Sequence, residues 1–126
     1  MNEIIHSYKD LIVWQKSIEL VICVYELTEK FPREEIYGLT SQIRRSVVSI
    51  PSNIAEGRRR GTRADYLHFL RMSYGSGAEL ETQLIIARKL PKTIKLDYNK
   101  IDSLLEEVMK MLNAMLNKLQ AKKLSS

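Results

Sequence analysis

Hydrophobic residues recur every three or four positions along most of this chain, which is the spacing of amphipathic α-helices. In the first such segment Trp14, Ile18 and Val21 follow this spacing, and Pro32 stops the pattern. No segment alternates apolar and polar residues as a half-buried strand would. The pattern predicts four helices, at residues 11–30, 40–56, 63–90 and 98–122.

The connections between these segments are short, and this predicts how the helices pack. Successive helices joined by short loops run antiparallel, and 126 residues is the length of one domain. We therefore expect an all-α protein, with a single domain over residues 1–126 that forms an antiparallel up-and-down four-helix bundle. The first helix is apolar over a wider arc than one small monomer needs, so we expect its surplus faces to bury against other copies of the chain.

The second predicted helix contains a proline. Ile50 and Ile54 keep the apolar register on both sides of Pro51, so we expect one kinked helix rather than two. Gly57 is of the residue type that commonly ends a helix in a left-handed conformation. We therefore place the end of this helix at residue 56 and a basic hinge at residues 57–61.

The third predicted helix carries small residues near its middle, among them Ser73, Ser76 and Gly77. Such residues lower helix propensity. Their presence predicts that another helix crosses closely at this level.

Charged residues on the second and third helices suggest an ion pair. If these helices are antiparallel, Arg44 and Arg45 fall at heights comparable to those of Glu79 and Glu81. We expect at least one structural Arg–Glu pair, within the fold or at a subunit interface, with ligand binding by the same arginines as the alternative.

Positive charge is concentrated in one part of the chain. The net charge is +5, and residues 41–71 alone carry seven arginines against two acidic residues, so the rest of the chain sums to zero. Arginine suits phosphate because its planar fork matches phosphate oxygens. The arginines are Arg44, Arg45, Arg58, Arg59, Arg60, Arg63 and Arg71.

The cluster from Arg58 to Arg63, with Arg71, is the strongest candidate for a nucleic-acid-binding site. Contacts of this kind would bind the phosphate backbone with little sequence choice. Tyr66, Phe69 and Tyr74 lie nearby in the sequence, as candidates for base stacking or for core packing. The alternative for the arginines is a solvated loop without a partner.

Catalytic patterns are few. Arg63 and His68 have the Arg-x4-His spacing of HEPN-type ribonucleases, which are also helical bundles, but Ala64 stands where those motifs usually place a polar residue. No other nucleophile, metal or phosphate-loop motif occurs, and the single Cys23 makes neither an intrachain disulfide nor a zinc site by itself. We expect no enzyme activity and no cofactor.

No apolar run approaches the length of a membrane span, and the first residues do not resemble a signal peptide. We expect a cytoplasmic protein without a membrane partner.

Residues 8–20, 31–57 and 75–84 resemble one known family. The middle segment reads aromatic-Gly-Leu, then Gln-Ile-Arg-Arg, then Ile-Pro-Ser-Asn-Ile-Ala-Glu-Gly. The family is that of the four-helix-bundle proteins encoded within intervening sequences of bacterial 23S rRNA genes, sometimes labelled S23 ribosomal proteins. The matching positions are Trp14, Tyr37, Gly38, Leu39, Gln42, Arg44, Arg45, Pro51, Asn53, Glu56, Gly57, Glu79 and Glu81.

This resemblance implies a four-helix bundle that assembles into a ring, typically a homopentamer. It also implies a link to the accessory variability proteins of diversity-generating retroelements, which bind a reverse transcriptase and its template RNA through basic surfaces. Most of the matching residues look structural, whereas the arginine-rich residues 58–60 depart from the family's pattern.

Together these observations predict a non-enzymatic homo-oligomeric adaptor that binds structured RNA, or RNA with a reverse transcriptase. Two alternatives stay open. One is a structural or protein-binding ring without a nucleic-acid role, and the other is a ribonuclease that uses Arg63 and His68.

Overall fold

The protein is all-α, as the periodicity predicted. The computed structural model describes residues 7–125, so the two ends of the expected domain, residues 1–6 and 126, lie outside the described residues. Within the described part the chain forms four α-helices and no strand. The elements are η1 (Tyr8–Asp10), α1 (Ile12–Thr28), η2 (Arg33–Glu35), α2 (Leu39–Arg60), α3 (Arg63–Ala87) and α4 (Asn99–Ser125).

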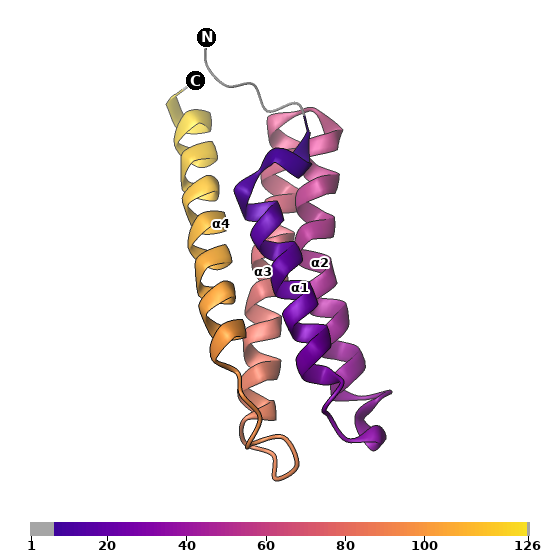
Figure 1. Cartoon of the computed structure of the whole chain (residues 1–126). Helices are drawn as coiled ribbons and strands as arrows, with labels where there is room; N and C mark the ends of the chain where they lie inside the picture. The colour runs from indigo at the N-terminus through magenta and orange to yellow at the C-terminus, as the bar shows by residue number, and fades with distance from the viewer. Residues whose placement is uncertain (1–6, 126) are drawn as a thin grey trace.

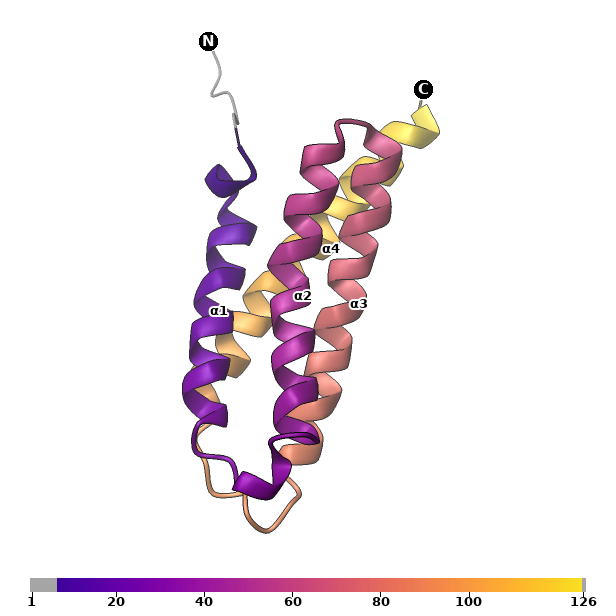
Figure 2. The ribbon, with the colours of Figure 1, turned by 90° about the vertical axis from the view of Figure 1, so that its right-hand side faces the viewer.

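The four helices run up and down in chain order (Figure 1). The α2–α3 turn lies at the same end of the bundle as the start of α1 and the end of α4, and the other two connections lie at the opposite end. Seen from the side, α2 and α3 run next to each other over their whole length, and α4 crosses behind them (Figure 2). Among the described residues, no helix has both the length and the apolar character to cross a membrane.

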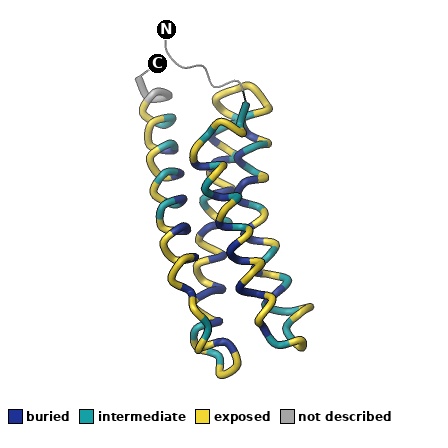
Figure 3. Tube along the Cα trace, viewed as in Figure 1, coloured by how far each residue is buried: buried dark blue, intermediate teal, exposed yellow. Residues whose placement is uncertain are grey.

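One hydrophobic core runs along the inside of the bundle. Leu20 of α1, Ile50 of α2, Leu80 of α3 and Val108 of α4 are completely buried. The buried positions line the inner side of each helix, and the exposed ones face outward (Figure 3). Burial of this apolar surface is the main favourable contribution to folding.

The end of α2 corrects the sequence prediction. We expected the helix to stop at residue 56 and Gly57 to open a hinge, but α2 continues to Arg60, and Gly61 is the left-handed residue, with φ of 87°. Gly57 is buried inside α2, where a Cβ would lie 2.7 Å from the Cβ of Phe69. Its role is therefore to let α3 approach closely, and Gly61 makes the turn.

The start of α3 follows directly from this turn. The Thr62 hydroxyl accepts a 3.1 Å hydrogen bond from the Asp65 backbone N–H, which caps the helix. The hinge predicted at residues 57–61 is thus reduced to the two residues between α2 and α3, and Arg58, Arg59 and Arg60 form the last turn of α2.

Pro51 is buried within α2, and the helix continues through it. Beside it, Ser73 Oγ of α3 donates a 2.8 Å hydrogen bond to the Ile50 carbonyl oxygen. Asn53 Nδ2 donates to both the carbonyl and the hydroxyl oxygen of Ser49, at 2.9 Å each. Polar side chains therefore occupy backbone acceptors around the proline.

The small residues of α3 lie where other helices cross, as the sequence predicted. Ser76 Oγ is 2.8 Å from Ser49 Oγ of α2, within hydrogen-bond distance. On the other side of α3, a Cβ at Gly77 would lie 2.2 Å from the sulfur of Met109 in α4. Small side chains of α3 therefore lie at its contacts with both α2 and α4.

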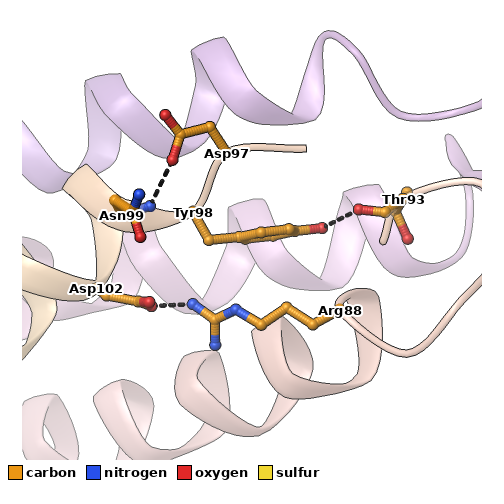
Figure 4. A network of polar contacts seen from close by, with 6 residues as sticks. All are labelled: Arg88, Thr93, Asp97, Tyr98, Asn99 and Asp102. Atoms are coloured by element: carbon orange, nitrogen blue, oxygen red, sulfur yellow. Dashed lines mark hydrogen bonds and ion pairs between the residues drawn. The ribbon is translucent and has the colours of Figure 1, made fainter. Parts of the chain in front are cut away.

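The connection from α3 to α4 is held by a polar network (Figure 4). Thr93 Oγ1 donates to the Ala87 carbonyl oxygen at 2.6 Å, and the Tyr98 hydroxyl donates to the Thr93 carbonyl oxygen at 2.8 Å. The Arg88 guanidinium pairs with the Asp102 carboxylate and lies 4.8 Å from the centre of the Tyr98 ring. These contacts end α3 at Ala87, three residues before the predicted end, and orient the start of α4.

Candidate nucleic-acid interface

The five arginines predicted to bind nucleic acid lie on the two helices that meet at one end of the bundle. Arg58, Arg59 and Arg60 end α2, Arg63 begins α3, and Arg71 follows two turns later. Arg58 is half-buried and the other four are exposed. We call these five residues the arginine surface. Four of them flank the α2–α3 turn, which is the connection at the upper end of the bundle in Figure 1.

Three of these guanidinium groups lie over aromatic rings. The Cζ atom of Arg60 is 5.0 Å from the centre of the Phe69 ring, and that of Arg58 is 5.8 Å from the Tyr66 ring. The Cζ atom of Arg59 is 5.7 Å from the ring of Tyr8, which precedes α1. A cation over an aromatic face is attracted by the ring quadrupole, so each contact limits the freedom of a long side chain.

The local charge balance is positive. Residues 56–71 carry five arginines against Glu56 and Asp65, a net charge of +3. Glu56, predicted as a structural residue, accepts a 2.9 Å hydrogen bond from Arg60 Nε, and both side chains are half-exposed. A surface pair of this kind contributes little to stability. The acidic residues therefore leave most of the positive charge of this end uncompensated.

The nearby aromatic residues pack within the fold. Tyr66 and Phe69 are half-buried, and both contact the position where Gly57 lacks a side chain. Burial raises the pKa of the Tyr66 hydroxyl above its usual value, and the charge of Arg58 opposes this shift. Tyr74 lines a groove between α3 and α4, together with Glu81.

The two residues of the ribonuclease pattern lie on one helix. Arg63 and His68 are both exposed on α3, five positions apart. On a continuous α-helix this separation turns the two side-chain directions by about 140°. The imidazole of His68 packs edge-on against Phe69, with ring centres 5.1 Å apart.

The predicted pairing of Arg44 or Arg45 with Glu79 or Glu81 is wrong within the fold, and a pair at a subunit interface stays a prediction. Arg44 turns toward α1, where its Nε donates a 2.8 Å hydrogen bond to Thr28 Oγ1. Among the described residues, no ion pair joins these arginines to these glutamates, and Arg45, Glu79 and Glu81 are exposed. The physical reason is rotational: position 44 lies on the side of α2 that faces α1.

The residues predicted to be structural include several that line a groove between α1 and α2. One part is a pocket of about 280 Å³ that is lined by Trp14 and Pro51, among other residues. The adjoining part contains Arg44 and Arg45, and Val48 lines both. The groove residues are Tyr8, Trp14, Ile18, Val21, Tyr25, Ser41, Arg44, Arg45, Val48, Ser49, Pro51, Ser52 and Ala55.

Sequence reasoning missed Tyr8 as a partner of the arginine surface. Tyr8 lies outside the periodic apolar pattern and far from Arg59 in sequence, so no spacing signal links the two residues. Its ring also meets Trp14 edge-on, with centres 5.4 Å apart. The fold therefore connects the arginine surface to one end of the α1–α2 groove.

Comparison with known proteins agrees with the fold and with the resemblance. Residues 9–114 match the family described as 23S rRNA-intervening sequence protein. A crystal structure of a protein of unknown function, from the S23 ribosomal protein family of Bacteroides thetaiotaomicron, is similar, with a TM-score of 0.69 and 23% sequence identity. The similarity covers 83% of this chain and 98% of that chain, and it shows a shared fold. A comparison with curated protein sequences gives no match.

Proposed function

The chain belongs to the 23S rRNA-intervening sequence protein family, and from this premise we propose that it is a non-enzymatic adaptor that binds RNA through the arginine surface. The observation that carries the proposal is the gathering of five arginines at one end of the bundle, three of them over aromatic rings.

Binding would act through the phosphate backbone. Guanidinium groups form strong paired hydrogen bonds with phosphate oxygens. The aromatic rings favour binding because they already restrict three of the side chains, so less conformational freedom is lost when the RNA binds. For five contacts to a single strand, the affinity should fall by roughly a hundredfold between 50 and 200 mM salt. Discrimination between RNA sequences should be weak.

Self-association is part of the proposal. Two isoleucines of α1, Ile12 and Ile22, are 61% and 54% exposed, and the α1–α2 groove is a further, largely apolar surface. A second copy of the chain would bury these surfaces, and contacts between unlike faces form a ring when the rotation between copies closes. The homopentamer implied by the family resemblance would present five arginine surfaces, and this repetition would raise the avidity for one RNA molecule.

The protein partner implied by the resemblance is a reverse transcriptase. Its gene would lie near that of this protein, and the two proteins would co-purify with RNA. This part of the proposal rests on the resemblance to the retroelement accessory proteins.

The test compares two triple variants that remove the same charge from opposite ends of the bundle. One replaces Arg58, Arg59 and Arg60 with alanine, and the control replaces Lys89, Lys95 and Lys100, which are exposed near the α3–α4 connection. Binding of a labelled RNA is measured by fluorescence anisotropy at low salt. The arginine variant should lose at least about tenfold in affinity and the lysine variant less than about twofold. Equal losses would mean that only net charge matters, and would refute the arginine surface as the binding site.

A second candidate function is a ring that docks a protein partner. The exposed apolar residues of α1 and the α1–α2 groove favour it. It predicts that the purified protein does not bind RNA even at low salt, and that substitutions in the groove, rather than in the arginine surface, abolish binding of the partner.

A further inference from the structure

Resting on the proposed function, we propose that the arginine surface takes unpaired RNA strands and not duplex RNA. The first reason is the direction of the side chains on α2. Arg58, Arg59 and Arg60 are consecutive residues of a regular helix, so their side chains leave the helix axis about 100° apart and span about 200° in total. They form a fan around the end of α2 rather than a row.

The second reason is the spread of charge onto α3. Arg63 and Arg71 extend the arginine surface along a second helix, and their separation of eight positions corresponds to a rise of about 12 Å. The phosphates of an A-form duplex have fixed positions, and proteins contact them across one side of the duplex. A rigid duplex would reach only part of this convex surface. A flexible single strand can bend around the α2–α3 turn and meet arginines on both helices.

The third reason is the pairing of guanidinium groups with aromatic rings. Arg59 lies over Tyr8 and Arg60 over Phe69, and both arginines are exposed. A ring lies on one side of each guanidinium group, and both side chains are exposed to solvent, where a ligand can reach them. Guanidinium planes are stacking partners for splayed-out bases. In a duplex the bases are already stacked on one another, so only an unpaired strand offers this contact.

The rings themselves are fixed by the fold. Tyr8 is held against Trp14 of α1, and Phe69 is half-buried against α2 at Gly57. The stacking partners are thus supported from behind by the bundle, which favours binding without rearrangement.

The experiment compares three labelled ligands of about 20 nucleotides under one salt condition. They are an RNA without internal complementarity, the same RNA annealed to its complement, and an abasic strand of equal length, which keeps the phosphates but lacks bases. We expect the single strand to bind at least about tenfold more tightly than the duplex, and to bind several-fold more tightly than the abasic strand. Duplex binding equal to or tighter than single-strand binding would overturn this inference but leave the proposed RNA-binding function standing. Binding to none of the three would overturn both.

A variant pair tests the role of the rings. Tyr8→Leu removes the ring below Arg59 without changing the charge, and Tyr37→Leu removes a tyrosine that is 97% exposed on the α1–α2 connection. Tyr8→Leu should weaken single-strand binding by about threefold, with an unchanged dependence on salt, and Tyr37→Leu should not. If circular dichroism shows that Tyr8→Leu is unfolded, Phe69→Leu below Arg60 replaces it. Equal single-strand affinities in the ring variant and in Tyr37→Leu would refute the contribution of the rings.

Discussion

Arg44 Nε donates a 2.8 Å hydrogen bond to the hydroxyl of Thr28, the last residue of α1. The same guanidinium lies 4.4 Å from the centre of the Tyr25 ring, and its second nitrogen is 3.4 Å from the Tyr25 carbonyl oxygen. Thr28 Oγ1 in turn donates to the Val24 carbonyl oxygen at 2.8 Å. One side chain of α2 therefore ties together the carboxyl-terminal turn of α1, where backbone acceptors favour a cation.

Arg44→Ala should destabilise the protein because it removes these contacts together. Hydrogen bonds from charged groups contribute more than neutral ones, but Arg44 is half-exposed, so we expect a loss of about 1–2 kcal/mol in the free energy of unfolding. Urea denaturation followed by circular dichroism measures it. Arg45→Ala is the matched control, because Arg45 is the exposed neighbour, and it should change the unfolding free energy by less than about 0.5 kcal/mol. Equal effects of the two substitutions would contradict a specific role for Arg44.

Glycines 57 and 75 should respond in opposite ways to the same substitution. In Gly57→Ala the added Cβ would lie 2.7 Å from the Cβ of Phe69, so α2 and α3 must move apart, at a cost of about 1–3 kcal/mol. In Gly75→Ala the added Cβ meets nothing within 4 Å. Since alanine favours the helix, this variant should be more stable by about 0.5–1 kcal/mol. The melting temperatures of the two variants are compared with that of the parent chain. If both variants melt at lower temperature than the parent, the α2–α3 contact at Gly57 is not the reason why Gly57→Ala is destabilised.

These two sites show what the sequence could and could not predict. Periodicity predicted the four helices, and the small residues of α3 predicted that another helix crosses closely at their level, without saying which one. The role of Gly57 was not predictable, because glycine serves both at helix ends and at close helix contacts, and Gly61, a few residues later, also fits a helix end.

The partner of Arg44 depends on how α2 is rotated about its axis. Neighbouring positions such as 44 and 45 differ by about 100° around the helix. A wrong assumption about how α2 is rotated about its axis therefore makes Arg44 face α3 instead of α1. The arginine surface was predicted from charge alone, since all five residues lie close together in sequence. The aromatic ring next to Arg59 was not predicted, because Tyr8 reaches that position only through the packing of η1 against α2.

The buried hydroxyl of Tyr66 predicts how stability depends on pH in alkaline solution. Burial raises the pKa of this group in the folded protein, so the unfolded chain loses its proton first as the pH rises through about 10. The folded state then binds more protons than the unfolded state, and stability falls as pH rises. Tyr66→Phe removes the ionisable group, so its unfolding free energy should decline less steeply above pH 10 than that of the parent chain.

Urea titrations between pH 8 and 11 measure this difference. Tyr37→Phe is the control, because that ring is 97% exposed, and it should follow the parent chain. A Tyr66→Phe profile that coincides with the parent profile would show that the hydroxyl of Tyr66 is not buried enough to affect folding.

The exposed apolar surface of α1 provides the test of self-association. Ile22→Glu places a charge on a position that is 54% exposed in the single chain, so the variant should stay folded. If copies of the chain bury this surface, the charge would be desolvated at the interface. The oligomer should then dissociate at concentrations where the parent chain remains assembled.

Ile94→Glu is the matched control, because Ile94 is similarly exposed, at 51%, on the α3–α4 connection. Size-exclusion chromatography with light scattering measures the mass of each variant. A monomeric parent chain would contradict assembly through this face of α1. An Ile22→Glu variant that keeps the parent's oligomeric mass would contradict it too, because burying an unpaired glutamate at the interface costs several kcal/mol.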